Sequence, residues 1–166
     1  MCWQCEHPGS TRADYLDYLR GMIGRFGWAV QGVHGDKIYS SWAYTVGLTP
    51  YRRPELVVTG MRLAEGTGLL NDVADHVVHA GPPKPGERIP LAGGPLIEIV
   101  KVTEPWAHLV MAVELFGRKV RALQLVHADD RGHWPWDVGY RGVRGGQPVL
   151  GIRGWGQDGP AAAWAS

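Results

Sequence analysis

The sequence predicts a single α+β domain, with a mainly antiparallel sheet and about three helices packed on it. Apolar residues recur at helical spacing in three segments, and between these segments strand-like runs follow one another without a helix. A doubly wound parallel sheet would need a helix between most strands. The chain has 166 residues, 45% of them hydrophobic and 20% charged, which is typical of a globular domain with a substantial core.

The first predicted helix begins after Ser10 and Thr11, which are residues that cap helix N-termini. Asp14 stands three residues after Thr11, close to the spacing of a capping box. Gly27 is placed to end the helix. Between them the apolar residues repeat at helical spacing: Leu16, Leu19, Ile23 and Phe26.

Three strand-like runs follow this helix: WAVQGV (28–33), WAYTVGL (42–48) and ELVVTG (55–60). The turn-rich stretch HGDK separates the first two, so we expect a connection of the hairpin type. A bend between Pro50 and Pro54 leads into the third run.

The second half of the chain repeats this alternation. A helix is expected from about Ala64 to His79, and GPPKPG (81–86) ends it. Its expected buried stripe consists of Leu69, Leu70, Val73, Ala74 and Val77. Two short strands are expected around Gly93 and Gly94, then a helix over 106–117 and a strand over 119–128. DDRGHWPWD is expected to form a structured turn. The predicted organisation is an N-terminal Cys/His segment (1–14), an α+β domain (15–150) and a Gly/Ala-rich, extended or mobile tail (151–166).

Charge and hydropathy argue against two classes of function. The net charge is +1, without the basic face that a nucleic-acid-binding protein uses to neutralise phosphates. No apolar run approaches the ~18 residues that cross a bilayer, and Glu6 and Pro8 interrupt any signal-like segment. We therefore expect a cytoplasmic protein with reduced cysteines.

The first seven residues carry Cys2, Cys5 and His7 in a C-x-x-C-x-H pattern. Thiolates and imidazoles are ligands that zinc prefers, but a tetrahedral site needs a fourth donor. His76 or His79, on the polar face of the second long helix beside Asp72 and Asp75, is the candidate. The alternatives are that the cysteines pack as small apolar side chains or form a redox pair, and that the histidines lie on a solvated helix face.

Several polar residues stand in strand or turn positions where they need partners. Glu55 opens an apolar strand, so it must pair, for example with Arg52 or Arg53, or face a pocket. Gln124 raises the same problem within the predicted strand 119–128. Asp129 and Asp130 form either a general acid/base pair against Trp134 and Trp136 or the acceptors of a tight turn. His34 and His108 are expected on the surface.

Four motifs together resemble the bacterial family described as domain of unknown function 4262: WAYTVGLT (42–49), PELVVTG (54–60), LQLVHADDRGHWPWD (123–137) and GQPVL (146–150). The resemblance covers about Tyr15 to Leu150, and the opening CWQCEHP resembles a subgroup feature. It implies an intracellular bacterial α+β protein and brings no established catalytic residue. It directs attention to a set of recurring positions: Tyr44, Gly47, Pro54, Glu55, Gln124, Asp130, Gly132, Pro135 and Trp136.

Three functions remain open at this point. The first is a zinc-binding protein of unknown activity, with Cys2, Cys5, His7, His76 and His79 as metal ligands. The second is a non-enzymatic interaction or immunity module that binds a protein partner, or a second copy, through Trp155, Trp164 and the tail, while Trp28, Trp42 and Trp106 lie in the core. The third is a metal-free enzyme or binder of a small ligand, whose pocket contains Glu55, Gln124 and Asp130 beside Tyr44 and Trp136.

Overall fold

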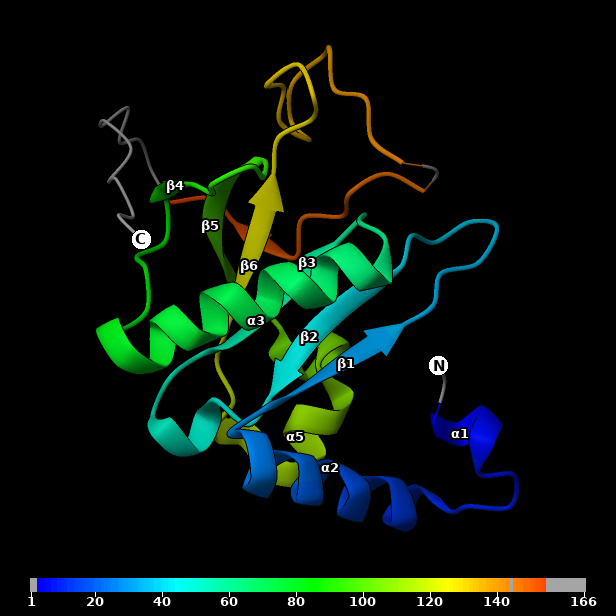
Figure 1. The fold of residues 1–166 in the computed structure, drawn as a ribbon. Coiled ribbons are helices and arrows are strands. Elements are labelled where there is room, and N and C mark those ends of the chain that lie inside the picture. The colour runs from blue at the N-terminus through cyan, green and yellow to red at the C-terminus, as the bar shows by residue number, and fades with distance from the viewer. Residues whose placement is uncertain (1–2, 144, 155–166) are drawn as a thin grey trace.

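The computed structural model describes residues 3–143 and 145–154 (Figure 1). In chain order its helices are α1 (Trp3–Glu6), α2 (Arg12–Phe26), α3 (Leu63–Ala80), α4 (Pro105–His108) and α5 (Val110–Phe116), with short 3₁₀ turns η1 (Thr49–Tyr51) and η2 (Gly117–Lys119). Its strands are β1 (Ala29–Val33), β2 (Trp42–Val46), β3 (Glu55–Thr59), β4 (Arg88–Pro90), β5 (Leu96–Val102), β6 (Ala122–His127) and β7 (Gly151–Ile152).

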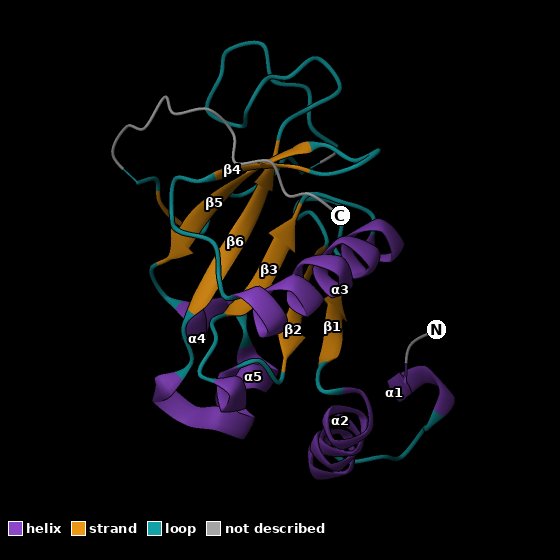
Figure 2. Ribbon diagram, turned by 60° about the vertical axis from the view of Figure 1, so that its left-hand side comes forward, coloured by secondary structure: helices purple, strands orange, loops and turns teal. Residues whose placement is uncertain are grey.

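The seven strands form one sheet in the order β1-β2-β3-β6-β5-β4, and β7 pairs with β5 (Figure 2). All pairs are antiparallel except β3 and β6, which run parallel with Glu55 opposite Ala122 and Val57 opposite Gln124. The prediction of an α+β domain with a mainly antiparallel sheet is confirmed. The parallel pair in its centre was not predicted, because β3 and β6 are separated by α3, β4 and β5 along the chain.

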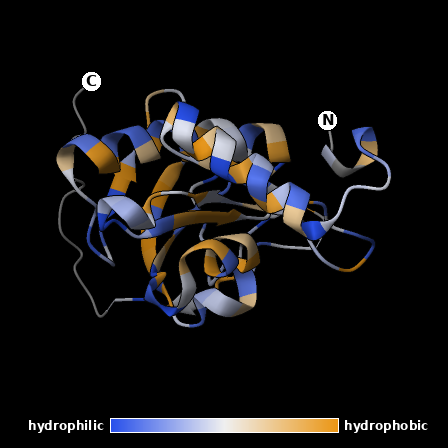
Figure 3. Ribbon diagram, turned by 90° about the horizontal axis from the view of Figure 1, so that it is seen from below, coloured by the Kyte–Doolittle hydropathy of each residue, from blue (hydrophilic) through white to orange (hydrophobic). Residues whose placement is uncertain are grey.

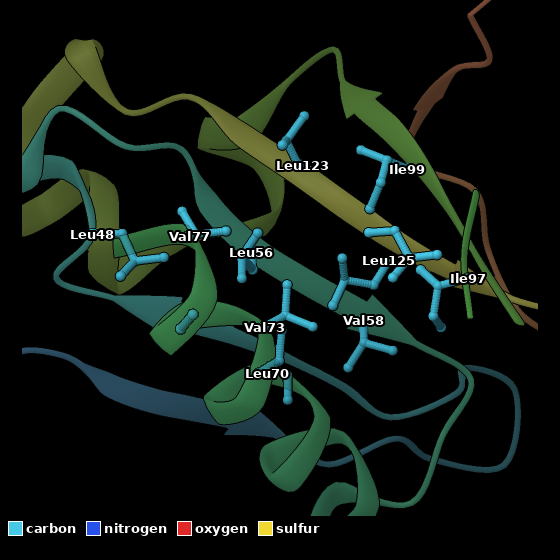
Figure 4. Close-up of a cluster of buried hydrophobic side chains, with 13 residues drawn as sticks. Leu48, Leu56, Val58, Leu70, Val73, Val77, Ile97, Ile99, Leu123 and Leu125 are labelled. Carbon is cyan, nitrogen blue, oxygen red and sulfur yellow. The ribbon is translucent and has the colours of Figure 1, made fainter. Parts of the chain in front are cut away.

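Helix α3 covers one face of the sheet and fills the main core. Leu70 and Val77 are fully buried, Val73 nearly so, and all three point from the helix toward the strands (Figure 4). They meet the side chains that β3, β5 and β6 present on this face: Leu56, Val58, Ile97, Ile99, Leu123 and Leu125. Burying a leucine or valine side chain contributes about 1.5–3 kcal/mol, so this cluster is a main source of the fold's stability.

Helices α4 and α5 cover the opposite face, so the strands lie between helices on both sides (Figure 3). One continuous helix over 106–117 was predicted, and this was wrong. Leu109 leaves the helical conformation, with φ −108° and ψ 56°, and its side chain is fully buried. Trp106, expected in the core, is 63% exposed.

The N-terminal segment is held by aromatic stacking. The ring of Trp3 lies 4.4 Å from that of His7 and 5.2–5.3 Å from those of Tyr15 and Tyr18 on α2. Helix α2 begins with the predicted capping box, in which Thr11 and the residue three positions later bond each other's backbone N–H. Offset aromatic pairs each contribute about 0.5–1.5 kcal/mol beyond area burial, and this fixes α1 against α2.

A ladder of stacked side chains joins the 134–136 turn and the end of the described chain to the sheet. The rings of Trp134 and Trp136 lie 5.5 Å apart and almost parallel. The guanidinium of Arg88 covers Trp134, and that of Arg153 covers Trp136 at 3.7 Å. Both guanidiniums bond the buried carboxylate of Glu98 on β5. Such a ladder ties three distant segments together through cation–π and ionic contacts.

The beginning of the predicted tail is ordered. Ile152 of β7 pairs with Lys101 of β5, so residues 151–152 belong to the sheet. The extended or mobile tail expected after Leu150 is otherwise outside the described residues from 155 onward, as are Trp155 and Trp164. No helix among the residues that the structure describes has both the length and the apolar character needed to cross a bilayer.

Candidate functional site at the ends of the parallel strands

A cavity of about 680 Å³ lies where β3 and β6 end and α3 begins. Figure 2 shows the arrowheads of both strands pointing toward the loops that follow them. We call it the strand-end cavity. The carboxyl ends of adjacent parallel strands are a common place for ligands, because the chain leaves each strand there and its loops diverge. The residues with charged or imidazole side chains in its lining are Arg62, Glu65, His127, Asp129, Asp130, Arg131 and Arg141.

His127, the last residue of β6, supplies an imidazole to this cavity. Its Nε2 lies 3.2 Å from the carbonyl oxygen of Thr59. A carbonyl only accepts, so this contact assigns the ring hydrogen to Nε2 and leaves Nδ1 as an acceptor. Burial lowers the pKa of His127, against the opposing effect of the Thr59 carbonyl. The ring is therefore neutral at pH 7 and can accept a hydrogen bond or a proton.

Asp129 builds the loop that closes one side of the cavity. Its side chain is 2% exposed, and its two oxygens accept the backbone N–H groups of Arg131, His133 and Arg141 at 2.8–2.9 Å. Burial raises the pKa of Asp129, but these three N–H donors outweigh it, and the pKa falls to about 2. Of the two alternatives predicted for Asp129 and Asp130, the turn acceptor describes Asp129.

We expect Asp129→Asn to destabilise the protein above about pH 4 and to matter progressively less below it. An asparagine keeps one acceptor but turns an NH₂ group toward the N–H of Arg141. Because the pKa is lowered in the folded state, the carboxylate stabilises the fold above the unfolded pKa, and this contribution is lost as the pH falls toward 2. Urea unfolding midpoints of both proteins between pH 2 and pH 7 measure the effect.

The matched control is Asp130→Asn, because Asp130 is the exposed neighbour of Asp129. Its unfolding midpoint should stay close to that of the unchanged protein at every pH. If the two variants behaved alike, Asp129 would not hold the loop in solution.

Gln147 holds the far end of the same loop against β6. Its side-chain amide accepts from the backbone N–H of His127 and donates to the carbonyl of His127, both at 2.9 Å, and also donates to the hydroxyl of Tyr140. The amide thus makes the two backbone hydrogen bonds with His127 that a neighbouring strand would make, at a position beyond the end of β3. Gly60 permits this approach: a Cβ there would lie 2.7 Å from the carbonyl oxygen of Gly146.

Some of the charged side chains around the cavity already have partners within the protein, and others do not. Arg62 pairs with Glu65 one turn along α3, and the oxygens of Asp129 are occupied by backbone N–H groups. Within the described part of the chain, the structure gives neither Arg131 nor Arg141 an ion pair. Two guanidiniums therefore remain to meet an incoming ligand, beside the exposed carboxylate of Asp130.

Glu55 lies at the other end of β3 and has a structural role. It is fully buried, and its carboxylate accepts five hydrogen bonds, at 2.7–3.2 Å, from the hydroxyls of Thr45 and Thr49 and the N–H groups of Gly47, Leu48 and Thr49. Burial raises the pKa of Glu55, and these hydrogen bonds oppose it. The predicted need for a partner is met by backbone N–H groups and hydroxyls.

Gln124 also holds a backbone segment. It is fully buried, and its amide donates to Thr59 Oγ1 and to the carbonyl of Pro148 and accepts from the N–H of Leu150, at 2.7–3.0 Å. Tyr44 is buried as well, its hydroxyl accepts the N–H of Met111, and burial raises its pKa to about 12. These groups position α5 and residues 148–150.

The structure does not gather the residues predicted for a metal-free pocket around one cavity. Asp130 lines the strand-end cavity and Trp136 stacks on Trp134, whereas Glu55 and Gln124 lie in the sheet. Glu55 faces Ala122 at the start of β6. The distance along the strand from Ala122 to His127 is roughly 16 Å, so Glu55 cannot reach a ligand in the strand-end cavity.

The predicted zinc ligands are also separated where they are described. Cys5 is exposed in α1, and Nδ1 of His7 lies 2.9 Å from the carbonyl of Trp3. His76 and His79 lie near the carboxyl end of α3, on the opposite side of the molecule from α1 (Figures 1 and 2). The described residues contain no group of three or more metal-ligating side chains. Cys2 lies outside them, so a zinc site at the N-terminus remains a prediction.

The residues that the sequence did not single out are Arg131, Arg141 and Gln147. His127 and Arg131 fall within the motif 123–137, but their role depends on the parallel pairing of β3 and β6, which brings Thr59 to His127. Arg141 and Gln147 lie in a glycine-rich segment without periodicity. A signal was nevertheless present: a long irregular segment inside a compact domain often carries function.

The comparisons with known proteins bear on the whole domain. The family model described as domain of unknown function (DUF4262) matches residues 22–141, a range that contains every functional group named in the strand-end cavity. Neither a curated protein nor a solved structure matches the chain. Since the matched range is well over half of the 166 residues, the chain belongs to the DUF4262 family.

Proposed function

We propose that this protein binds a small anionic molecule, one that carries a phosphate or carboxylate group, in the strand-end cavity. The observation that carries the proposal is the convergence of Arg131 and Arg141 on one cavity at the carboxyl ends of β3 and β6. Guanidiniums bind phosphates and carboxylates through two parallel hydrogen bonds.

Helix α3 supports the same choice of ligand. It is 18 residues long and begins at the cavity, and its N-cap residue Arg62 makes no side-chain capping bond. The first N–H groups of a helix and its positive dipole end favour negative charge. The helix therefore adds to the two arginines and does not define the site by itself.

The size of the cavity and its rigid walls favour a small molecule. Its volume of about 680 Å³ falls within the usual range for small-molecule sites, about 300–1,000 Å³. Asp129 and Gln147 fix the loop that carries the arginines without using its guanidiniums. A fixed loop backbone lowers the conformational entropy that is lost when a ligand arrives.

Isothermal titration with inorganic pyrophosphate and with succinate tests the proposal, and putrescine serves as a cationic comparison. We expect saturable binding of at least one anion and none of putrescine. Replacing both Arg131 and Arg141 with alanine should weaken the binding about tenfold or more. The control is the double variant Arg20→Ala and Arg25→Ala, which removes two exposed charges from α2.

Two results would refute the proposal. One is the absence of saturable binding of either anion. The other is an equal loss of affinity in the two double variants, which would show a response to overall charge and not to a site at the strand ends.

A further inference from the structure

A second cavity, of about 470 Å³, lies on the other side of Thr59 from the strand-end cavity. It shares no lining residue with the strand-end cavity. Its walls come from the 34–40 connector, the start of β2, the end of α4 and the 148–150 segment. We call it the aromatic cavity, after the side chains that dominate it: His34, Tyr39, Trp42, His108, Pro148 and Leu150.

Dedicated hydrogen bonds fix the inner walls of this cavity. The indole N–H of Trp42 donates to the carbonyl of His108 at 3.3 Å and ties β2 to α4. The buried amide of Gln124 bonds both Pro148 and Leu150, and Thr59 Oγ1 donates to the carbonyl of Pro148 at 2.7 Å. The inner walls are therefore preformed and do not depend on an occupant.

The outer wall is a tight loop built on Asp36. Its carboxylate accepts the N–H groups of Ile38 and Tyr39 at 2.7–2.8 Å, and the N–H of Gly35 donates to Ser41 Oγ. The two backbone donors lower the pKa of Asp36. Tyr39 stands in this loop; it lines the cavity and is 67% exposed.

The chemistry of these walls selects a planar aromatic ligand. The lining combines the aromatic side chains of Trp42 and Tyr39, the apolar side chains of Pro148 and Leu150, and the imidazoles of His34 and His108. Aromatic rings gain about 0.5–1.5 kcal/mol from ring contacts beyond the area they bury. A mostly apolar cavity with a few polar groups is typical of a small-molecule site.

We infer that the aromatic cavity is a binding site for a small planar aromatic molecule, held between Trp42 and Tyr39 with a polar substituent on His34 or His108. The inference does not depend on the proposed anion site, because no lining residue is common to the two cavities. It gives His108, expected on the surface, a place in a cavity wall.

The test uses two probes of equal carbon skeleton, 2-naphthol and its saturated counterpart decahydro-2-naphthol, followed by ¹⁵N–¹H NMR. With 2-naphthol we expect saturable shifts of the Trp42 indole N–H and the Thr59 amide. The saturated probe should bind about fivefold more weakly or worse, because it lacks the ring contacts. Tyr39→Ala should weaken the binding of 2-naphthol to a similar extent.

The matched control is Tyr51→Ala, which removes another exposed tyrosine that does not line the cavity. His34→Ala is a second variant for the case that Tyr39→Ala disturbs the loop, and it too should weaken binding. No saturable shift at Trp42, equal affinity for the two probes, or unchanged affinity in both cavity variants would overturn the inference. Each of these results would leave the proposed anion site untouched, because pyrophosphate binding is measured separately.

Discussion

Glu55→Gln is expected to lower the free energy of unfolding by about 3 kcal/mol. The five groups around the Glu55 carboxylate are all donors. A glutamine of the same shape turns an NH₂ group toward some of them. At least one buried donor then loses its acceptor, at about 1–3 kcal/mol, and the facing donors repel each other.

Chemical denaturation followed by circular dichroism measures this loss, with Glu104→Gln as control. Glu104 is exposed, and its side chain makes no cap at α4, so its variant should change the stability by less than about 0.5 kcal/mol. If Glu55→Gln were equally neutral, the 47–49 segment would not depend on the carboxylate, and Glu55 would again be available for a role in binding.

Glu98→Gln is the second variant with a large expected effect, about 2–3 kcal/mol. Glu98 is 3% exposed, and its carboxylate forms ion pairs with both Arg88 and Arg153. Removing one partner leaves two guanidiniums without their carboxylate, although both are partly exposed and water offsets part of the loss. We also expect the stack of Trp134 and Trp136 to loosen, because Arg88 and Arg153 cover its two ends.

Denaturation gives the stability change, and near-ultraviolet circular dichroism reports the tryptophan stack. The matched control is Glu114→Gln, which removes the partner of Arg12 in a more exposed ion pair and should cost less than about 1 kcal/mol. Equal effects of the two variants would mean that the burial of Glu98 does not strengthen its ion pairs. The ladder would then form because the protein folds, without adding to its stability.

Local signals in the sequence predicted the local structure well. The capping box of Thr11 and the apolar stripe that includes Leu70 and Val77 each act within a few residues, so α2 and α3 were predicted nearly to their observed ends. The break at Leu109 was missed because its cause is tertiary: the side chain is buried under the sheet. Periodicity alone reads the same residues as one helix.

The candidate site was harder to predict, because its parts are distant in sequence. The parallel pairing of β3 with β6 brings Thr59 to His127, and no local pattern encodes that pairing. Polar residues such as Glu55 and Gln124 did stand out as needing partners. Their partners are backbone groups of loops, however, and a sequence does not show which loop returns to which strand. Glu55 and Gln124 are thus explained by the loops that they hold.

The most direct test of the strand-end site is to observe its arginines during anion binding. ¹⁵N–¹H spectra of the arginine Nε–H groups, recorded during a titration with pyrophosphate, should show saturable shifts at Arg131 and Arg141, accompanied by the ring of His127. Arg20 and Arg25 should not follow the same curve. Shifts that rise equally at all four arginines and never saturate would contradict a site at the ends of β3 and β6.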